Sequence, residues 1–508
     1  MSETTIQKFS RAAPWSLIAK IFGSVIGIIT SIIIVRDLGA HDYGVLSLVN
    51  NILGFITVIC AFGLGQALTR YVPELNVKHN FSGIKKLMVQ VAVVQTIIWL
   101  TAFIIIYFIR GFLSDLFSAD IGFYLLLGTG LIVLGIFGGI IGGVLHALYE
   151  VKILTIIGTI SSIISTVLLL FLLLKFHLGI IGVMIAGPIV GGATLPILFI
   201  VFRKKIREEY LKHGDPKSGD IGTKRLFKYS IPFVASGIMN LIVWRQSEVL
   251  FLGYYSSPLE VGYYNLAYGL PQQILEFIPL AIWGLVLVSF AETYTKDPRK
   301  LQHAIELYYK MLFLLVAPLL VIGFLLSDKI ILVLYGEQMM PAGSIAQTFF
   351  IIFAIGFIGT PTGMTLYTLE KTWVKTILYA IYTIMNLSLD VLLIPKYEMY
   401  GAVAAVFITL FVSAFIEIIV VKRFFKEFRI PWKFIMKCYL ATTPLLIIVP
   451  FKAYIESSIE LLIALSVAVM LIIIGLRVCR VIGEDEEEII SQINIPFKEL
   501  ILKVVRKK

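Results

Sequence analysis

Long uncharged apolar segments recur along the whole of this 508-residue chain, and they constrain its fold more than any other feature. A membrane-spanning helix needs about 20 consecutive apolar residues. Fourteen segments reach this length: 14–35, 44–69, 87–109, 121–148, 153–174, 178–202, 229–254, 262–291, 307–327, 343–369, 373–394, 400–421, 434–451 and 461–479. Hydrophobic residues make up 58% of the chain and charged residues 15%, whereas soluble domains carry about 25% charged residues. The sequence excludes a water-soluble enzyme and predicts an all-α polytopic membrane protein, because the segments lack the alternation of barrel strands.

Positive charge is distributed unevenly between the two sets of loops that connect these spans. If the N-terminus, the even-numbered loops and the C-terminus share one side, nearly all of the 43 Lys and Arg residues lie on that side. The other loops hold only Arg36, Arg110, Lys175, Lys329, Lys396 and Lys452. Because cytoplasmic loops carry the excess of Lys and Arg, we expect a multi-pass protein of the cell membrane with both termini in the cytoplasm. The net charge of +11 then comes from the Lys and Arg residues that set the orientation in the membrane, and it also favours contact with anionic lipid headgroups. No nucleic-acid partner is expected.

Landmark residues recur at an almost constant offset along the chain. Four sets do so: Gly44 and Gly262 (218 residues apart), Gly182 and Gly401 (219), Glu150 and Glu370 (220), and Phe62-Gly63-Leu64 with Trp283-Gly284-Leu285 (221). They predict two homologous lobes of six helices each, around a central cavity. Six is an even number, so both lobes begin on the same side of the membrane and the repeat is parallel.

The repeat sets the expected domain organisation. We expect an N-lobe at 1–205, a cytoplasmic linker at 206–228, a C-lobe at 229–422, two extra C-terminal spans at 423–480 and a cytoplasmic tail at 481–508. Five apolar residues of the tail share one helical face: Phe497, Leu500, Ile501, Val504 and Val505. This pattern favours an amphipathic helix on the inner leaflet over a disordered basic tail.

Ionisable residues inside spans are the candidates for a site, because each is costly at mid-membrane. Arg245 and Glu248 lie one helical turn apart in the seventh span. They could simply neutralise each other within the bundle. The functional alternative is that Arg245 binds a substrate phosphate, since its planar fork makes two parallel hydrogen bonds, and that Glu248 holds its orientation.

Lys20 lies about a turn and a half inside the first span. It could extend to the inner headgroups or act as a second cation in the cavity. By the repeat offset it falls opposite Asn240, so we expect both side chains to face inward.

Glu276 lies in the eighth span between Pro271 and Pro279, which should bend that helix. A carboxylate at a bend is a candidate for coupling a proton or sodium ion, or a further partner for Arg245. Asp390 and Glu417 lie close to span ends and are expected at the membrane interfaces.

Uncharged polar residues in the spans could bind sugar hydroxyls, although helix contacts are their commoner use. The candidates are Asn50, Asn51, Gln66, Asn265, Gln272 and Gln273, of which Asn51 and Gln272 are the chosen substrate-binding candidates. Small-residue patterns in the fourth and sixth spans indicate close helix packing: Gly138, Gly139, Gly142, Gly143, Gly187 and Gly191. The three Cys and six His show no metal-binding spacing, so neither a metal nor a cofactor is expected.

Two motifs carry a family resemblance: Leu38-Gly39-x-x-Asp42-Tyr43-Gly44, and Phe62-Gly63-Leu64-x-x-Ala67-Leu68-x-Arg70-Tyr71. They resemble the opening of the polysaccharide-transport (oligosaccharide flippase, Wzx-like) family. That family belongs to the multidrug/oligosaccharidyl-lipid/polysaccharide exporter superfamily. The resemblance covers the whole chain and implies alternating access, in which the two lobes rock about a central cationic cavity that opens to one side of the membrane and then to the other. It also implies that this cavity takes a glycan-phosphate head while the polyprenyl tail stays in the bilayer.

The sequence therefore predicts a flippase that moves a polyprenyl-phosphate-linked oligosaccharide from the inner to the outer leaflet and works as a monomer. In the family that the chain resembles, flippases of lipid-linked peptidoglycan precursors often carry several cations in the first lobe. Here the deep Arg lies in the second lobe, which favours other lipid-linked oligosaccharides over a peptidoglycan precursor. One alternative is a cation-coupled multidrug antiporter of the same superfamily, although such proteins usually have twelve spans. A membrane glycan polymerase or ligase is a more distant alternative, because those enzymes use a sizeable external loop.

Overall fold

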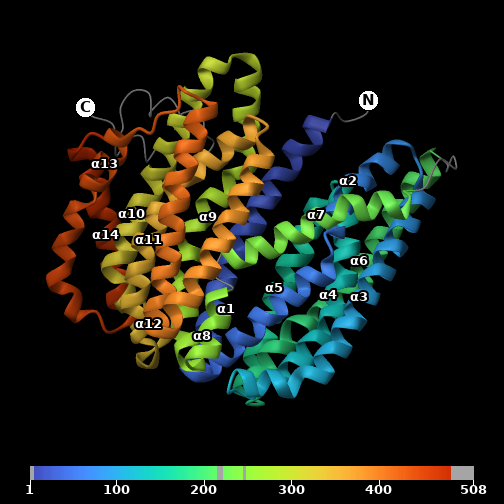
Figure 1. Cartoon of the computed structure of the whole chain (residues 1–508), viewed down its shortest axis with the longest axis horizontal. Coiled ribbons are helices and arrows are strands. Elements are labelled where there is room, and N and C mark those ends of the chain that lie inside the picture. The colour runs from blue at the N-terminus through green and yellow to red at the C-terminus, as the bar shows by residue number, and fades with distance from the viewer. Residues whose placement is uncertain (1–4, 214–220, 244–246, 482–508) are drawn as a thin grey trace. The chain divides into compact units, whose positions relative to one another are not determined.

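The computed structural model describes residues 5–213, 221–243 and 247–481, shown as coloured ribbon in Figure 1. For residues 5–21, 209, 212–213, 276–285 and 288 it describes the backbone alone. The described residues form α-helices and three 3₁₀-helices, and they contain no strand. The prediction of an all-α polytopic fold is confirmed.

Two compact units make up the chain, Met1–Gly262 and Tyr263–Lys508. The boundary after Gly262 differs from the predicted linker at 206–228 because α7 and α8 pack against α1 within the first unit, and α7 also packs against α2. The two units are defined by contacts between residues, whereas the predicted lobes are defined by the sequence repeat. The lobe boundaries therefore remain a prediction.

The first unit consists of eight helices and the start of a ninth: α1 (Thr5–Ala61), α2 (Leu64–Val77), α3 (Phe81–Leu116), α4 (Gly122–Ala147), α5 (Val151–Leu174), α6 (Gly179–His213), α7 (Thr223–Leu241), α8 (Ser247–Tyr255) and the first residues of α9 (Pro258–Lys296). α1 contains the first predicted span and most of the second, joined at Gly39, whose φ of 72° is in the left-handed region, while the end of the second span lies in α2. Glycine tolerates this conformation because it has no Cβ. Positive φ values at Phe62 and Gly63 then separate α1 from α2.

The second unit contains the rest of α9 and the remaining elements: η2 (Pro298–Lys300), α10 (Leu301–Tyr335), η3 (Glu337–Met339), α11 (Pro341–Thr368), α12 (Thr372–Phe424), α13 (Trp432–Ala441), η4 (Thr443–Tyr454) and α14 (Ser458–Val478). α12 contains two predicted spans separated at Glu398, where φ is 51°. α14 begins with a capping box, in which Ser457 and Glu460 satisfy each other's backbone N–H groups.

Ten helical segments of the described chain are long and apolar enough to cross a membrane. Two of them, Phe22–Val77 and Thr372–Phe424, each contain a pair of predicted spans. The seventh and eighth predicted spans correspond to α7–α8 and α9, which include residues outside the fully described part. The chain is a multi-pass membrane protein, and fourteen spans remains the prediction compatible with this structure.

Helix-ending turns in the two units recur at the spacing of the predicted repeat. Residues with positive φ pair as Ser118 with Gly336, Tyr149 with Glu370, and His177 with Glu398, at offsets of 218 to 221. At the second pair the capping bonds match as well: the Glu150 N–H donates to Leu145 O at 3.0 Å, and the Lys371 N–H to Leu366 O at 2.9 Å. Two homologous halves would produce this correspondence.

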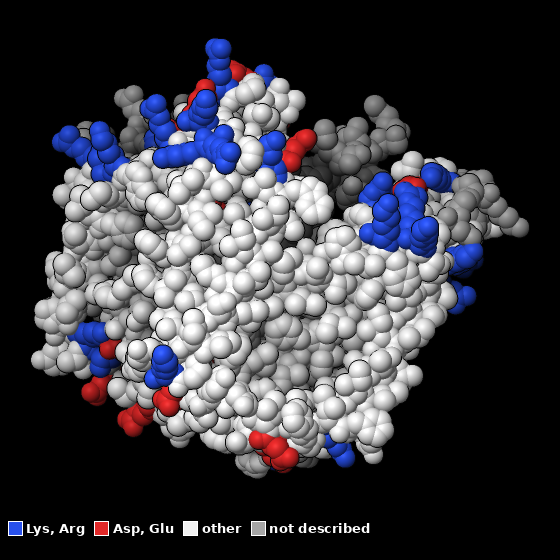
Figure 2. All heavy atoms as spheres, in the orientation of Figure 1, with Lys and Arg blue, Asp and Glu red and all other residues white. Residues whose placement is uncertain are grey.

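Charged side chains gather near the ends of the helices. On the face drawn in Figure 2, uncharged residues cover a wide surface between the charged rims. Large apolar side chains point outward along the described helices, for example Phe108 at 78% exposed and Phe415 at 61%. Hydrocarbon rather than water must cover such a surface.

Candidate functional site

The helical geometry of the predicted seventh span changes just before its charged residues. α7 ends at Leu241 and residues 242–243 form a wider π turn, which often marks functional sites. Residues 244–246, including the candidate Arg245, lie outside the described residues. Glu248 begins the next stretch, one residue into α8, and its side chain is fully buried. Glu248 therefore places a buried carboxylate in the predicted seventh span, and its role with Arg245 remains a prediction.

α8 lies against the second half of α1 in antiparallel orientation. A Cβ added to Gly44 would lie 1.6 Å from the carbonyl oxygen of Pro258, the first residue of α9, so the backbone of α1 touches the chain just after α8. Further along, a Cβ on Gly253 would lie 2.7 Å from a methyl of Leu48. This register places Asn51, one turn after Leu48, level with the first turn of α8.

Asn51 is buried, with 4% of its side chain exposed. Its carbonyl oxygen has no hydrogen-bond partner among the described residues. A buried carboxamide oxygen without a donor costs about 1–3 kcal/mol. Asn51 is therefore suited to accept a hydrogen bond from a bound group such as a hydroxyl.

The structure gives less information on the other predicted residues. Asn240 is exposed in the last turn of α7, and Gln272 is half-buried in α9. Lys20 in α1 and Glu276 in α9 have helical backbones, but their side chains are outside the described part. Their roles remain predictions, and so does the inward orientation of Lys20 and Asn240.

A cavity of about 930 Å³ lies within the first unit, among α1, α2, α3, α4 and α6. None of its lining residues is charged, and its polar side chains are Asn50, Thr57, Gln95 and Thr194. The sequence analysis proposed Asn50 but missed Gln95, which is isolated in an apolar segment. A cavity without cations fits the uncharged part of a substrate better than a phosphate.

Glycines form much of the cavity wall. Cβ atoms added to Gly135, Gly139 or Gly191 would meet nothing within 4 Å among the described residues. At Gly138 and Gly143 the added atom would contact Leu195 and Leu68 at ordinary distances. The expectation of close helix packing is therefore wrong for Gly139, Gly142 and Gly191, which leave open space.

Gln95 has a fixed orientation on this wall. Its amide nitrogen donates to the carbonyl oxygen of Ala61 at 2.9 Å. A flipped amide would bring two acceptors together, so the bond defines which atom is nitrogen. The amide oxygen is buried and has no partner among the described residues.

Two buried polar clusters lie in the second unit, where the sequence analysis expected interfacial acids. Asp390 is fully buried and accepts a bond from the Asn386 amide at 3.2 Å, and the Thr409 hydroxyl donates to the Asn386 carbonyl at 2.9 Å. Glu417 pairs with the ammonium of Lys375 and accepts a bond from Thr362 at 2.8 Å. Both acids are buried in helix contacts. The partner of Asp390 lies one turn away on the same helix, whereas the partners of Glu417 are 42 and 55 residues away in the chain.

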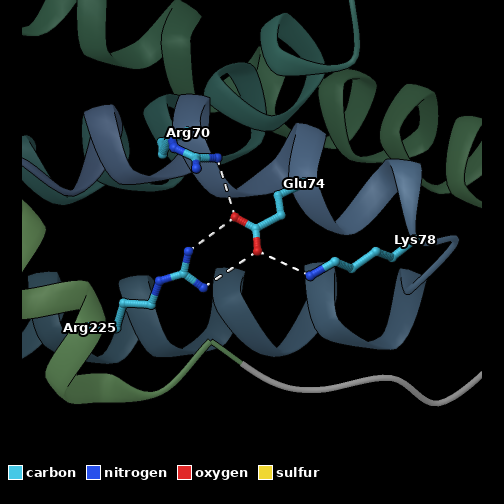
Figure 3. Close-up of polar contacts among 4 residues, drawn as sticks. All are labelled: Arg70, Glu74, Lys78 and Arg225. Atoms are coloured by element: carbon cyan, nitrogen blue, oxygen red, sulfur yellow. Dashed lines mark hydrogen bonds and ion pairs between the residues drawn. The ribbon is translucent and has the colours of Figure 1, made fainter.

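α2 and α7 are joined by a charged cluster at their ends, drawn in Figure 3. The Glu74 carboxylate accepts bonds from Arg70, Lys78 and Arg225 at 3.2 to 3.4 Å. The Arg225 guanidinium also lies over the ring of Tyr71, 4.9 Å from its centre. These contacts attach α7 to the first unit.

A family model described as polysaccharide biosynthesis protein matches residues 10–288, more than half of the chain. The chain belongs to this family. The predicted resemblance to polysaccharide-transport proteins is confirmed. An uncharacterized membrane protein of Methanocaldococcus jannaschii is similar to this chain, with 21% identity over 421 residues. The alignment covers 78% of this chain and 80% of that protein.

Solved structures show the same fold. The lipid II flippase MurJ, in an inward closed conformation, aligns with a TM-score of 0.65 and 17% identity, covering 91% of this chain and 98% of MurJ. An inward-facing multidrug resistance MATE transporter of the MOP superfamily aligns with a TM-score of 0.63 and 13% identity. That alignment covers 79% of this chain and 94% of the transporter. This polysaccharide biosynthesis family member thus has the fold shared by MurJ and MATE transporters.

Proposed function

We propose that this protein is a flippase that moves a lipid-linked oligosaccharide of the polyprenyl-phosphate type from the inner to the outer leaflet. The observation that carries the proposal is the extent of the fold match. A flippase fold covers 91% of the chain, whereas the similar multidrug transporter folds cover 79% to 82%. Membership of the polysaccharide biosynthesis family supports a glycan substrate.

The protein works in the cell membrane as a monomer with both termini in the cytoplasm. The charge distribution over the loops supports this orientation. A substrate made in the cytoplasm then reaches the protein from its basic side.

The charged and the neutral parts of the substrate bind different residues. The phosphate binds Arg245, assisted by Lys20, while Glu248 orients Arg245. The orphan carbonyl of Asn51 accepts a hydroxyl from the glycan, with Asn240 and Gln272 as further polar contacts. The uncharged cavity of the first unit accommodates a neutral part of the substrate.

A coupling cation, H⁺ or Na⁺, supplies the driving force. Glu276 is the sequence-based candidate for binding it. Asp390 is a second candidate, because its carboxylate is fully buried and accepts a hydrogen bond from the amide nitrogen of Asn386. Carboxylate oxygens are among the ligands that hard cations prefer.

The test is deletion of the gene in its host, followed by measurement of lipid-linked oligosaccharides in each leaflet with a membrane-impermeant glycan probe. We expect one species to accumulate on the cytoplasmic face. Wild-type protein should reverse this accumulation, and Arg245→Ala should not. Unchanged lipid-linked glycans and intact surface glycans, together with loss of cation-dependent drug efflux, would instead establish the antiporter alternative.

A further inference from the structure

A second hollow of about 840 Å³ lies on the first unit, between the first turns of α3 and the end of α6. Eleven residues line it: Lys85, Met88, Val89, Phe199, Ile200, Phe202, Arg203, Lys204, Ile206, Arg207 and Tyr210. We call this hollow the α3–α6 pocket. It shares no lining residue with the uncharged cavity described above.

Four of these residues are cations and none is an acid. Lys85 comes from α3, while Arg203, Lys204 and Arg207 come from α6. Within the described part of the chain, none of the four forms an ion pair. Lys205, their immediate neighbour, differs because it pairs with Glu150 at 2.7 Å. Among the residues whose side chains the structure describes, the positive charge of the pocket is therefore not compensated by an acid.

The other seven lining residues are apolar or aromatic. Several are strongly exposed, including Ile200 at 65%, Val89 at 61% and Phe199 at 51%. On α6 three apolar residues, Phe199, Ile200 and Phe202, precede the three cations at 203, 204 and 207, with Ile206 between the cations and Tyr210 after them. An apolar surface therefore adjoins the cationic one along the helix. A matching ligand has an anionic head next to a hydrocarbon chain.

This arrangement also matches the membrane. In the orientation proposed above, the end of α6 lies on the cytoplasmic side, where the leaflet carries anionic lipids. Basic pockets between membrane helices on that side bind anionic headgroups. The N-terminus of α3 adds the positive end of a helix dipole near Lys85.

We propose that the α3–α6 pocket binds an anionic phospholipid of the inner leaflet. Its headgroup phosphate lies among Lys85, Arg203, Lys204 and Arg207, and an acyl chain covers Val89, Phe199 and Ile200. The lipid is a resident partner and not the transported molecule, because the pocket is separate from the residues assigned to the substrate. The proposal depends on the proposed orientation but not on transport activity.

The experiment titrates the purified full-length protein in detergent with dioleoyl phosphatidylglycerol, and in parallel with dioleoyl phosphatidylcholine, which has the same chains. Bound lipid is counted by native mass spectrometry. We expect saturable binding of the anionic lipid alone. Each cation near an anionic head contributes about fivefold in affinity, so Lys85→Gln with Lys204→Gln should weaken binding by roughly 25-fold.

The matched control is Lys224→Gln with Lys228→Gln. These two exposed lysines of the same unit remove the same charge but do not line the pocket. The control should bind like wild type, and equal loss in both variants would overturn the proposal in favour of diffuse attraction.

Inorganic phosphate at the same concentration should not compete, and Ile200→Asn should weaken lipid binding. Competition by inorganic phosphate would show that the pocket binds a phosphate group without an acyl chain, and would overturn the proposal. Co-purification of a polyprenyl-phosphate glycan that the pocket variant loses would make this a substrate site, and it too would overturn the proposal.

Discussion

The carboxylate of Glu74 on α2 accepts hydrogen bonds from both terminal nitrogens of Arg225 on α7, at 3.2 and 3.4 Å. The contact joins residues 151 positions apart. Gly63 reinforces it at the other end of α2, where an added Cβ would lie 2.4 Å from the carbonyl oxygen of Ser230. Together these contacts explain why α7 packs with the first unit although the repeat assigns it to the second lobe.

Breaking this contact should loosen α7 measurably but modestly. Glu74→Gln leaves three cations without a countercharge, and exposed ion pairs contribute about 0.2–1 kcal/mol each. We expect a loss of about 1–2 kcal/mol in the free energy of unfolding, read as a lower thermal midpoint in detergent. In a double-mutant cycle, Arg225→Gln should add little to Glu74→Gln, and full additivity would mean that the two residues do not interact.

Gly44 should tolerate no side chain. Gly44→Ala would place its Cβ 1.6 Å from Pro258 O, and overpacking typically costs about 1–3 kcal/mol. We expect a clearly lower thermal midpoint and less folded protein by size-exclusion chromatography. Gly65→Ala is the control, because a Cβ there meets nothing within 4 Å of the described chain. Equal behaviour of the two variants would refute the close approach.

Arg245→Ala should abolish transport while leaving the protein in the membrane, because the substrate phosphate loses its bidentate partner. Lys20→Ala should reduce transport less. The measurement is the leaflet distribution of the lipid-linked glycan in a deletion strain carrying each variant at equal abundance. Unchanged transport by Arg245→Ala would leave Arg245 a structural role only, and total loss with Lys20→Ala would reverse their ranking.

The two buried acids of the second unit should respond differently to neutralisation. Asp390→Asn keeps a hydrogen-bonding group of the same size but removes the charge that a coupling ion needs. We expect a folded protein whose transport no longer depends on the sodium or proton gradient. Glu417→Gln instead leaves Lys375 buried without its countercharge, at a cost of about 3–5 kcal/mol, and should lower the yield of folded protein. Retained ion dependence in Asp390→Asn would return the coupling role to Glu276.

Most of the fold could be predicted because the membrane imposes long apolar segments that show directly in a sequence. Turns such as those at Tyr149 and Glu370 recur at a spacing compatible with the predicted repeat, and helix-ending positions depend on local backbone chemistry. Partners distant in the chain could not be predicted. Glu417 was expected at an interface because it lies close to a span end, and its partner Lys375, 42 residues away, could not be recognised from the sequence. Glycines that line a cavity also have the same spacing in the sequence as glycines at helix contacts.

The open glycines give the last prediction, that filling the cavity blocks transport without unfolding the protein. Gly139→Leu adds a side chain where an added Cβ meets no described atom within 4 Å, on the wall that also carries Gln95. Because an added Cβ at this position meets no described neighbour and the side chain extends from the cavity wall, we expect the thermal midpoint to stay within a few degrees of wild type. Transport should fall at least tenfold if a neutral part of the substrate passes through this space. Gly158→Leu on α5 is the control, since it is equally open but does not line the cavity, and it should transport normally. Normal transport by Gly139→Leu would remove the cavity from the substrate path and leave Asn51 and Arg245 as the contacts to pursue.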